Sequence, residues 1–199
     1  MLYIRGQSEI LSAVILIGIT LIMGIGLVSI AVPTILRISE ENNRRTLLIN
    51  EQSNLVIYKE YETPTHVYIG ILRVEPSSTP YALAILSKDL RADVIWVTGV
   101  NDLIQFPTAQ NNPVSRIVFS KNIFYFYNGE YYELPTYEYI NVVYIPQDIV
   151  ENYVSKAKPF IISINKDTLR SLGIGEARVM LLIQVSDKFY EVGEWIVTT

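Results

Sequence analysis

The feature that most constrains this chain is a run of 27 consecutive residues without a charge, from Ile10 to Leu36. At about 1.5 Å per residue, a helix of this length spans roughly 40 Å, which is enough to cross a bilayer. A removable secretory signal has an apolar region of only about 7 to 15 residues and ends at an Ala-x-Ala-like site. The run therefore predicts a permanent helix that lies in lipid or among other apolar helices.

The sequence divides into three parts: a short leader at 1–6, a helical region at 7–52 and a head domain at 53–199. The second part of the helical region carries opposite charges four residues apart, which is typical of a solvated helix face. These residues are Arg37, Glu40, Glu41, Arg44 and Arg45. Pro33 lies inside the helical region, where it removes one backbone hydrogen bond, so we expect a kink there.

The head domain predicts strands, because its many Ile, Val and Tyr side chains fit a pleated, half-buried surface. We expect strands at 54–61, 66–75, 81–87, 92–99, 115–120, 141–146, 159–165 and 177–186. The one helical candidate in this half is 146–157. Roughly nine strands with one short helix indicate an antiparallel β-sandwich, so the fold class is mainly β with one long N-terminal α-helix.

Two hairpins are predicted. Asn128 and Gly129 tolerate the positive φ angles of a two-residue type I′ turn, so the strands on either side should pair closely. A second hairpin is expected around 186–188. Glu130 and Glu133 accompany four tyrosines at the first hairpin. This set either packs across the strands or forms a binding surface suited to a glycan, with Tyr125, Tyr127, Glu130, Tyr131 and Tyr132 as the candidate residues.

Composition argues against several classes of chemistry. The chain has no cysteine, which removes disulfides, thiol nucleophiles and Cys-ligated metals, and its single histidine cannot build a His-rich metal site. We interpret His66 as a polar residue at the start of a strand rather than as a base or ligand. The net charge of −4 disfavours nucleic acid as a partner. We expect no catalytic residues, no metal and no cofactor.

Two Gly-Ile-Gly motifs occur, at 24–26 and 173–175. Neither has the strand-to-helix context that phosphate binding needs. In the first, Gly24 and Gly26 together with Gly18 offer small faces for close helix packing in an apolar environment. A plain anchor with incidental glycines is the alternative, since glycine is common in membrane helices. The second motif predicts a turn between strands.

The start of the chain has a basic residue and a glycine, Arg5-Gly6, followed by the polar Gln7-Ser8-Glu9 and then by the apolar run. This order resembles the amino-terminal signature of the archaeal type IV pilin and archaellin-like superfamily, whose precursors carry class III signal peptides. In one branch the cleavage site precedes Gln-x-Ser-x-Glu, and the spacing here is contracted. The resemblance covers about one fifth of the chain and leaves the head domain unassigned.

The resemblance implies that a prepilin-peptidase-like membrane protease cuts between Gly6 and Gln7, with Arg5 before the cut, and that the helix stays with the mature protein. It also implies a precursor in the cell membrane, with its head outside, and then an extracellular filament formed by copies of the chain. Helices would fill the filament core and β-rich heads its surface. The residues expected to serve helix assembly are Glu9, Gly18, Gly24, Gly26 and Pro33.

Three classes of function follow. The first is a structural subunit of an archaeal type IV pilus-like surface filament, which is the function we expect. The second is a membrane-anchored extracytoplasmic β-sandwich that binds another envelope component, as archaellum stator-like proteins do. The third is a membrane-tethered enzyme, for which the sequence offers no titratable groups at a recognisable spacing.

Overall fold

The computed structural model describes residues 3–88, 103–109, 116–135 and 139–199, with side chains from residue 11 onward. Its contacts divide the chain into two compact units, residues 1–47 and 48–199. The expected strand at 92–99 lies outside the described residues.

The first unit is formed by most of α1, a 51-residue helix that runs from Tyr3 to Ser53. The helix expected over 7–52 is present, and residues 3–6 of the expected leader continue it without a break. Pro33 lies inside this helix and does not interrupt it. Because proline has no N–H, the carbonyl of Ser29 loses its helical amide donor at that position.

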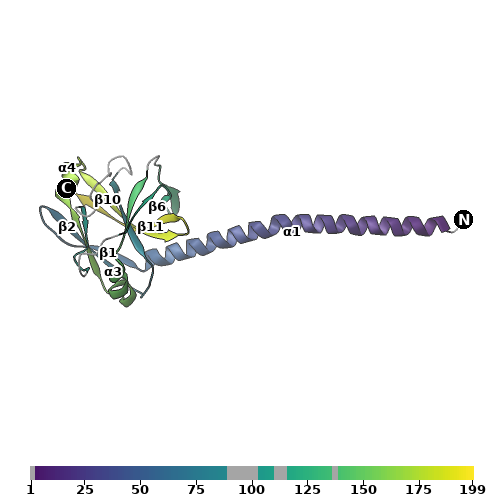
Figure 1. The fold of residues 1–199 in the computed structure, drawn as a ribbon, viewed down its shortest axis with the longest axis horizontal. Coiled ribbons are helices and arrows are strands. Elements are labelled where there is room, and N and C mark those ends of the chain that lie inside the picture. The colour runs from purple at the N-terminus through teal and green to yellow at the C-terminus, as the bar shows by residue number, and fades with distance from the viewer. Residues whose placement is uncertain (1–2, 89–102, 110–115, 136–138) are drawn as a thin grey trace. The chain divides into compact units, whose positions relative to one another are not determined.

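The second unit contains the last residues of α1 and, among its described residues, eleven strands and three short helices (Figure 1). The strands are β1 (Leu55–Glu62), β2 (His66–Arg73), β3 (Tyr81–Ser87), β4 (Ile104–Gln105), β5 (Ile117–Ser120), β6 (Ile123–Tyr127), β7 (Glu130–Glu133), β8 (Ile140–Tyr144), β9 (Phe160–Asn165), β10 (Glu176–Val185) and β11 (Lys188–Thr198). The helices are α3 (Gln147–Asn152), η2 (Val154–Lys156) and α4 (Lys166–Ser171).

These strands form two sheets, one of four strands in the order β1-β2-β9-β4 and one of seven in the order β5-β8-β3-β10-β11-β6-β7. The mainly β class with one long N-terminal helix is therefore confirmed. One pair departs from the expected antiparallel arrangement, because β6 runs parallel to β11, with Ile123 opposite Phe189. The other described strand pairs are antiparallel.

Both predicted hairpins are confirmed. Asn128 and Gly129 have φ angles of 49° and 87°, and the residues on either side of them, Tyr127 and Glu130, lie directly opposite each other. The second hairpin joins β10 to β11, with Val185 opposite Lys188. Local turn chemistry is sufficient to fix these two connections, which is why the sequence predicts them well.

The helical content of the head differs from the prediction. The segment at 146–157 forms α3 and η2 rather than one helix. It is not the only helix in this half, because α4 follows β9 and is capped by Asn165, whose side chain accepts the Thr168 N–H at 3.1 Å. Gly173 then ends α4 with φ of 73°, so the second Gly-Ile-Gly motif lies between a helix and a strand and not between two strands.

Most buried side chains lie between the two sheets, where residues of β2 and β9 meet residues of β3, β10 and β11. A second cluster lies on the opposite face of the seven-stranded sheet. Strand β3 contributes to both clusters in alternation: Tyr81, Leu83 and Ile85 join the first, and Ala82, Ala84 and Leu86 join the second. The centre of the larger sheet is therefore buried on both faces.

Candidate functional site

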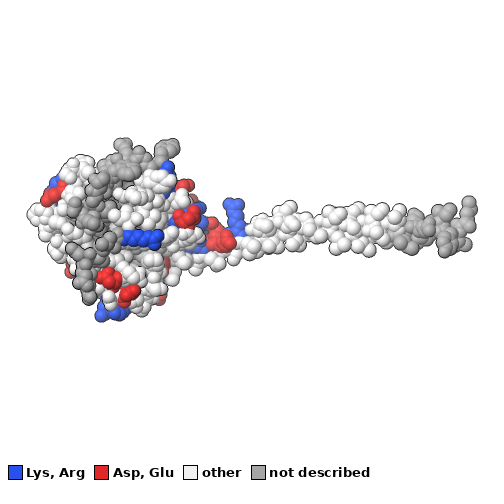
Figure 2. All heavy atoms as spheres, in the orientation of Figure 1, with Lys and Arg blue, Asp and Glu red and all other residues white. Residues whose placement is uncertain are grey.

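The most unusual surface of the first unit is the apolar length of α1. Its large aliphatic and methionine side chains between Leu11 and Leu36 are 47% to 72% exposed in the single chain. Figure 2 shows this length of the helix without charged side chains. Its length and composition are sufficient to cross a membrane. Apolar surface of this extent is stable only when lipid or protein removes it from water.

The hydroxyl groups on this part of α1 are satisfied within the helix. Thr20, Ser29 and Thr34 each donate a hydrogen bond of 2.7 to 2.8 Å to the carbonyl oxygen four residues earlier. In an apolar medium an unpaired hydroxyl is costly, and back-bonding of this kind removes that cost. These side chains therefore do not prevent α1 from entering lipid or a helix bundle.

Small residues are arranged along one side of α1. Ala13, Thr20, Gly24 and Ala31 are spaced by seven, four and seven residues, which places them on one helix face. Gly24 is also at the centre of a shallow groove whose lining residues are Ile17, Thr20, Leu21, Gly24, Ile25, Val28 and Ser29. Gly18 and Gly26 lie off this stripe. A Cβ added at any of the three glycines would meet nothing within 4 Å, so the packing of the single chain does not require them.

The residues of the expected processing site, Arg5, Gly6 and Gln7, belong to the helical backbone of α1, as does Glu9. Their side chains lie outside the described part of the chain. Pro33 is on the same helix, near the end of the uncharged run.

The second unit holds the last residues of α1 through one helix face. Leu48 is 1% exposed and belongs to the core between the sheets. Glu51, three residues later, is buried, and the Gln52 side-chain amide donates a hydrogen bond of 2.9 Å to the Tyr131 hydroxyl. A spacing of three and four residues places these side chains together on one side of the helix. The end of α1 is therefore part of the head's core.

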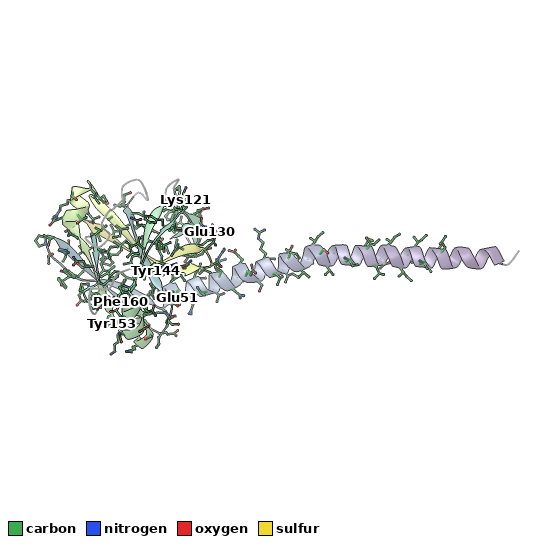
Figure 3. All side chains as sticks on the ribbon, in the orientation of Figure 1. Glu51, Lys121, Glu130, Tyr144, Tyr153 and Phe160 are labelled. Atoms are coloured by element: carbon green, nitrogen blue, oxygen red, sulfur yellow. The ribbon has the colours of Figure 1, made fainter. Side chains whose placement is uncertain are left out.

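Glu51 (Figure 3) is the centre of a buried polar cluster. Arg73 donates two hydrogen bonds to its carboxylate, from Nε at 3.1 Å and from Nη2 at 3.0 Å. The Tyr81 hydroxyl donates a third at 2.6 Å, and Thr79 lies at 3.5 Å from the same carboxylate. The second terminal nitrogen of Arg73 donates to the backbone carbonyl of Glu75. The bidentate ion pair joins α1 to β2. The first residue of β3 and the connection between β2 and β3 add further hydrogen bonds to it.

Burial and the neighbouring charges raise the pKa values of two members of this cluster. The hydrogen bond to Glu51 raises the pKa of the Arg73 guanidinium. Burial, and then the hydrogen bond to Glu51, raise the pKa of the Tyr81 hydroxyl far above its ordinary value. Both groups therefore keep their protons throughout the physiological range. A group that neither gains nor loses a proton in this range does not serve as a general acid or base.

A second buried carboxylate, Glu191, lies where the short ladder between β6 and β11 ends. Its side chain accepts the Phe126 N–H at 2.9 Å and two contacts from Arg178 at 2.9 and 3.0 Å. Its backbone carbonyl accepts the Tyr131 hydroxyl at 2.8 Å. Burial raises the pKa of Glu191, against the lowering effects of the Phe126 amide and Arg178. Glu191 thus connects the β6–β7 hairpin to the sheet where backbone pairing stops.

The candidate tyrosines of this hairpin divide between two faces. Tyr131 packs against the core, and burial raises its pKa. Tyr127 and Tyr132 are 58% and 42% exposed, while Tyr125 is half-buried and lies 5.9 Å from Tyr132 between ring centroids. Glu130 is exposed and accepts the Tyr132 hydroxyl at 3.2 Å. The structure therefore keeps Tyr125, Tyr127, Glu130 and Tyr132 together and separates Tyr131 from them.

Two other titratable residues of the described head, His66 and Lys166, make local contacts. His66 is the first residue of β2, and its ring contacts the neighbouring Thr65 hydroxyl. Lys166 forms an ion pair with Glu62 at 2.8 Å and lowers the pKa of that carboxyl. Within the described ranges no three histidine, aspartate or glutamate side chains are grouped as metal ligands would be. Sequence reasoning missed the Glu51–Arg73 pair, because 22 residues separate its members.

No protein-family model matches the chain, and no curated protein or solved structure matches it.

Proposed function

We propose that this chain is a structural subunit of an archaeal type IV pilus-like surface filament. In this proposal α1 packs against the helices of other copies, the head faces outward, and the chain has no catalytic role. The precursor lies in the cell membrane, and a prepilin-peptidase-like protease removes residues 1–6 before assembly at the cell surface.

The observation that carries this proposal is the exposed apolar surface of α1 with its stripe of small residues. An anchor needs only about 20 apolar residues of any shape. The uncharged run here has 27 residues, and its stripe at Ala13, Thr20, Gly24 and Ala31 would let a second helix approach closely.

The buried ion pair at Glu51 supports the same proposal. A subunit held in a filament by its helix must keep the end of that helix attached to the head. Leu48 and the Glu51–Arg73 pair make this connection with buried contacts, which a flexible linker would not provide.

A second candidate function is a membrane-anchored extracytoplasmic head that binds another envelope component. The observation that favours it is the continuity of α1, which begins at Tyr3 and has no break at Gly6. In this case the leader stays attached, and the helix serves as a single membrane span.

Intact-mass measurement of the chain from native membranes distinguishes the two functions, together with negative-stain microscopy of sheared surface material. A chain that begins at Gln7 and is a major component of filaments supports the filament subunit. A chain that retains Met1 to Gly6, in cells whose sheared material contains no filament with this chain, supports the anchor.

A variant pair tests the packing role of α1. We expect Gly24→Leu to reduce filament yield strongly, because the added side chain would fill the groove that a second helix needs. Ile22→Leu keeps volume on the same helix and serves as the matched control. Wild-type filament yield from Gly24→Leu would contradict close packing at this face.

A further inference from the structure

The exposed face of the β6–β7 hairpin carries a small cluster of side chains outside the core. We name Tyr127, Glu130 and Tyr132 the tyrosine–glutamate notch. The two ring centroids are 6.5 Å apart in an edge-on arrangement, and Glu130, opposite Tyr127 in the hairpin, accepts the Tyr132 hydroxyl. Glu130 is shown on the hairpin in Figure 3. Both rings are exposed, so core packing accounts for neither.

The chemistry of the notch suits a cation. The faces of aromatic rings attract guanidinium and ammonium groups, and a carboxylate beside them adds an ion pair. In the described part of the head, aromatic rings outside the notch have a cation of the chain over them at 4.6 to 5.8 Å, namely Phe124, Tyr125, Tyr139 and Tyr144. One of these cations, Arg178, lies over Tyr125, the ring next to Tyr132. In the described part of the chain no such contact involves Tyr127 or Tyr132.

The charged segment of α1 supplies cations that could fill it. Arg37 and Arg45 are exposed, and among the described residues neither forms an ion pair, whereas Arg44 pairs with Glu41. The hairpin carries Glu130 and Glu133 and no basic residue between Ile123 and Leu134. The same helix segment carries Glu40 and Glu41 beside its three arginines, so its net charge is +1, against −2 on the hairpin. The two segments therefore have net charges of opposite sign, as two contacting surfaces of one repeating subunit would have.

We infer that the tyrosine–glutamate notch receives Arg37 or Arg45 from a second copy of this chain. A guanidinium can stack on a tyrosine ring while it pairs with the Glu130 carboxylate, which a neutral ligand cannot do. This inference rests on the proposed function, since it requires copies to lie side by side, and it identifies a contact between subunits outside the apolar core.

The absence of native cysteine gives a direct test in the full chain. Two differently tagged copies are produced together in the native membrane, one with Glu130→Cys and the other with Arg37→Cys or Arg45→Cys, and are then oxidised. We expect a disulfide-linked dimer of the two tagged copies with at least one of the arginine positions. The matched control uses Glu60→Cys in place of Glu130→Cys. Glu60 is an exposed residue of β1, far from the hairpin in sequence, so this control should give little cross-linked product.

A charge exchange adds a second readout. Glu130→Arg alone, and Arg37→Glu with Arg45→Glu alone, should each lower filament yield by about tenfold, since a carboxylate–guanidinium pair with ring stacking is lost and like charges face each other. Combining the exchanges should restore most of the yield. Recovery distinguishes a contact between the two sites from independent damage at each.

The outcomes separate this inference from the proposed function. Filaments whose copies cross-link through Gly24→Cys on α1, but not between position 130 and positions 37 or 45, would overturn the inference and leave the filament proposal standing. Absence of both products and of filaments would overturn both. A third outcome would also overturn the inference: a neutral sugar such as glucose binds at the notch, and no cross-link forms at position 130. Sugar binding would be detected as shifts of the Tyr127 and Tyr132 resonances in detergent-solubilised protein.

Discussion

Glu51 and Arg73 are an ion pair that the fold surrounds almost completely, with side chains 7% and 6% exposed. Removing two charges from water costs as much as their attraction returns, so such a pair adds little net stability over an apolar pair of the same shape. Its value lies in geometry. Two hydrogen bonds from Arg73 and one from Tyr81 fix Glu51 in a single orientation, and with it the end of α1.

Breaking this pair should be costly. We expect Glu51→Gln to lower the free energy of unfolding of the head by about 3 to 5 kcal/mol, because the Arg73 guanidinium stays buried without a counter-charge. Urea denaturation of the detergent-solubilised chain, followed by near-UV circular dichroism, measures the change. The control is Glu41→Gln, which removes the exposed Arg44 pair and should change stability by less than about 0.5 kcal/mol. Similar losses for both variants would contradict the buried-pair argument.

Glu191 and Glu62 are two carboxylates that the fold shifts in opposite directions. Burial raises the pKa of Glu191, while hydrogen bonds from Lys166 and Lys59 lower the pKa of Glu62. In the unfolded chain both should titrate near pH 4.3. The contribution of Glu191 is fully present below that pH and is lost as the pH rises through its folded pKa. The contribution of Glu62 is present above that pH and is lost as the pH falls through its folded pKa.

Stability measured against pH should separate these two groups. We expect the free energy of unfolding of the wild type, relative to Glu191→Gln, to decrease as the pH rises from about 4 to 7. Relative to Glu62→Gln, it should increase as the pH rises from about 3 to 5. Urea titrations of the three proteins at matched ionic strength give both differences. Slopes of the same sign would show that one of the two assigned environments is wrong.

At the scale of elements, the sequence predicted best what local chemistry decides. The Asn128–Gly129 turn and the strands with clear runs of Ile, Val and Tyr lie close to their expected positions, because turn residues and alternation act within a few neighbours. The parallel pairing of β6 with β11 could not be read in this way. About sixty residues separate the two strands, and the buried Glu191 that helps to join them has no local signature.

Helix α4 was missed because six residues are too few for a helical period to be visible. The residues that mark α4 in the sequence are those that cap its two ends. Asn165 at the start accepts the Thr168 N–H, and at the end the Gly173 N–H donates to Arg170 and the Ile174 N–H donates to Leu169. This is a Schellman motif, with Gly173 in the left-handed conformation that favours glycine.

Two neighbouring glycines should therefore respond differently to alanine. Gly173→Ala should lower the free energy of unfolding by about 1 to 2 kcal/mol, because alanine is strained at a φ of 73°. Gly175→Ala should be nearly neutral, since Gly175 is not among the positive-φ residues and an added Cβ meets nothing within 4 Å. Urea midpoints of the two variants test this comparison, and equal losses would place the strain elsewhere.

At the scale of the whole molecule, sequence and contacts divide the chain at different points. Composition changes near residue 53, where charged helix gives way to strand-forming residues. Contacts divide it between Leu47 and Leu48, so the last helical residues belong to the head. The sequence could not show this, because Leu48 and Glu51 resemble ordinary helix residues until Arg73 and the core between the sheets are brought against them.

Truncation should reveal this division. A fragment of residues 46–199 retains Leu48 and Glu51, and we expect it to be soluble without detergent and to unfold cooperatively. A fragment of residues 54–199 leaves Arg73 buried without a partner and opens the cavity of Leu48, so it should be less stable by more than about 3 kcal/mol. Size-exclusion chromatography and urea denaturation of both fragments measure the difference. Equal stability would mean that the contacts of Leu48 and Glu51 do not contribute to the stability of the head.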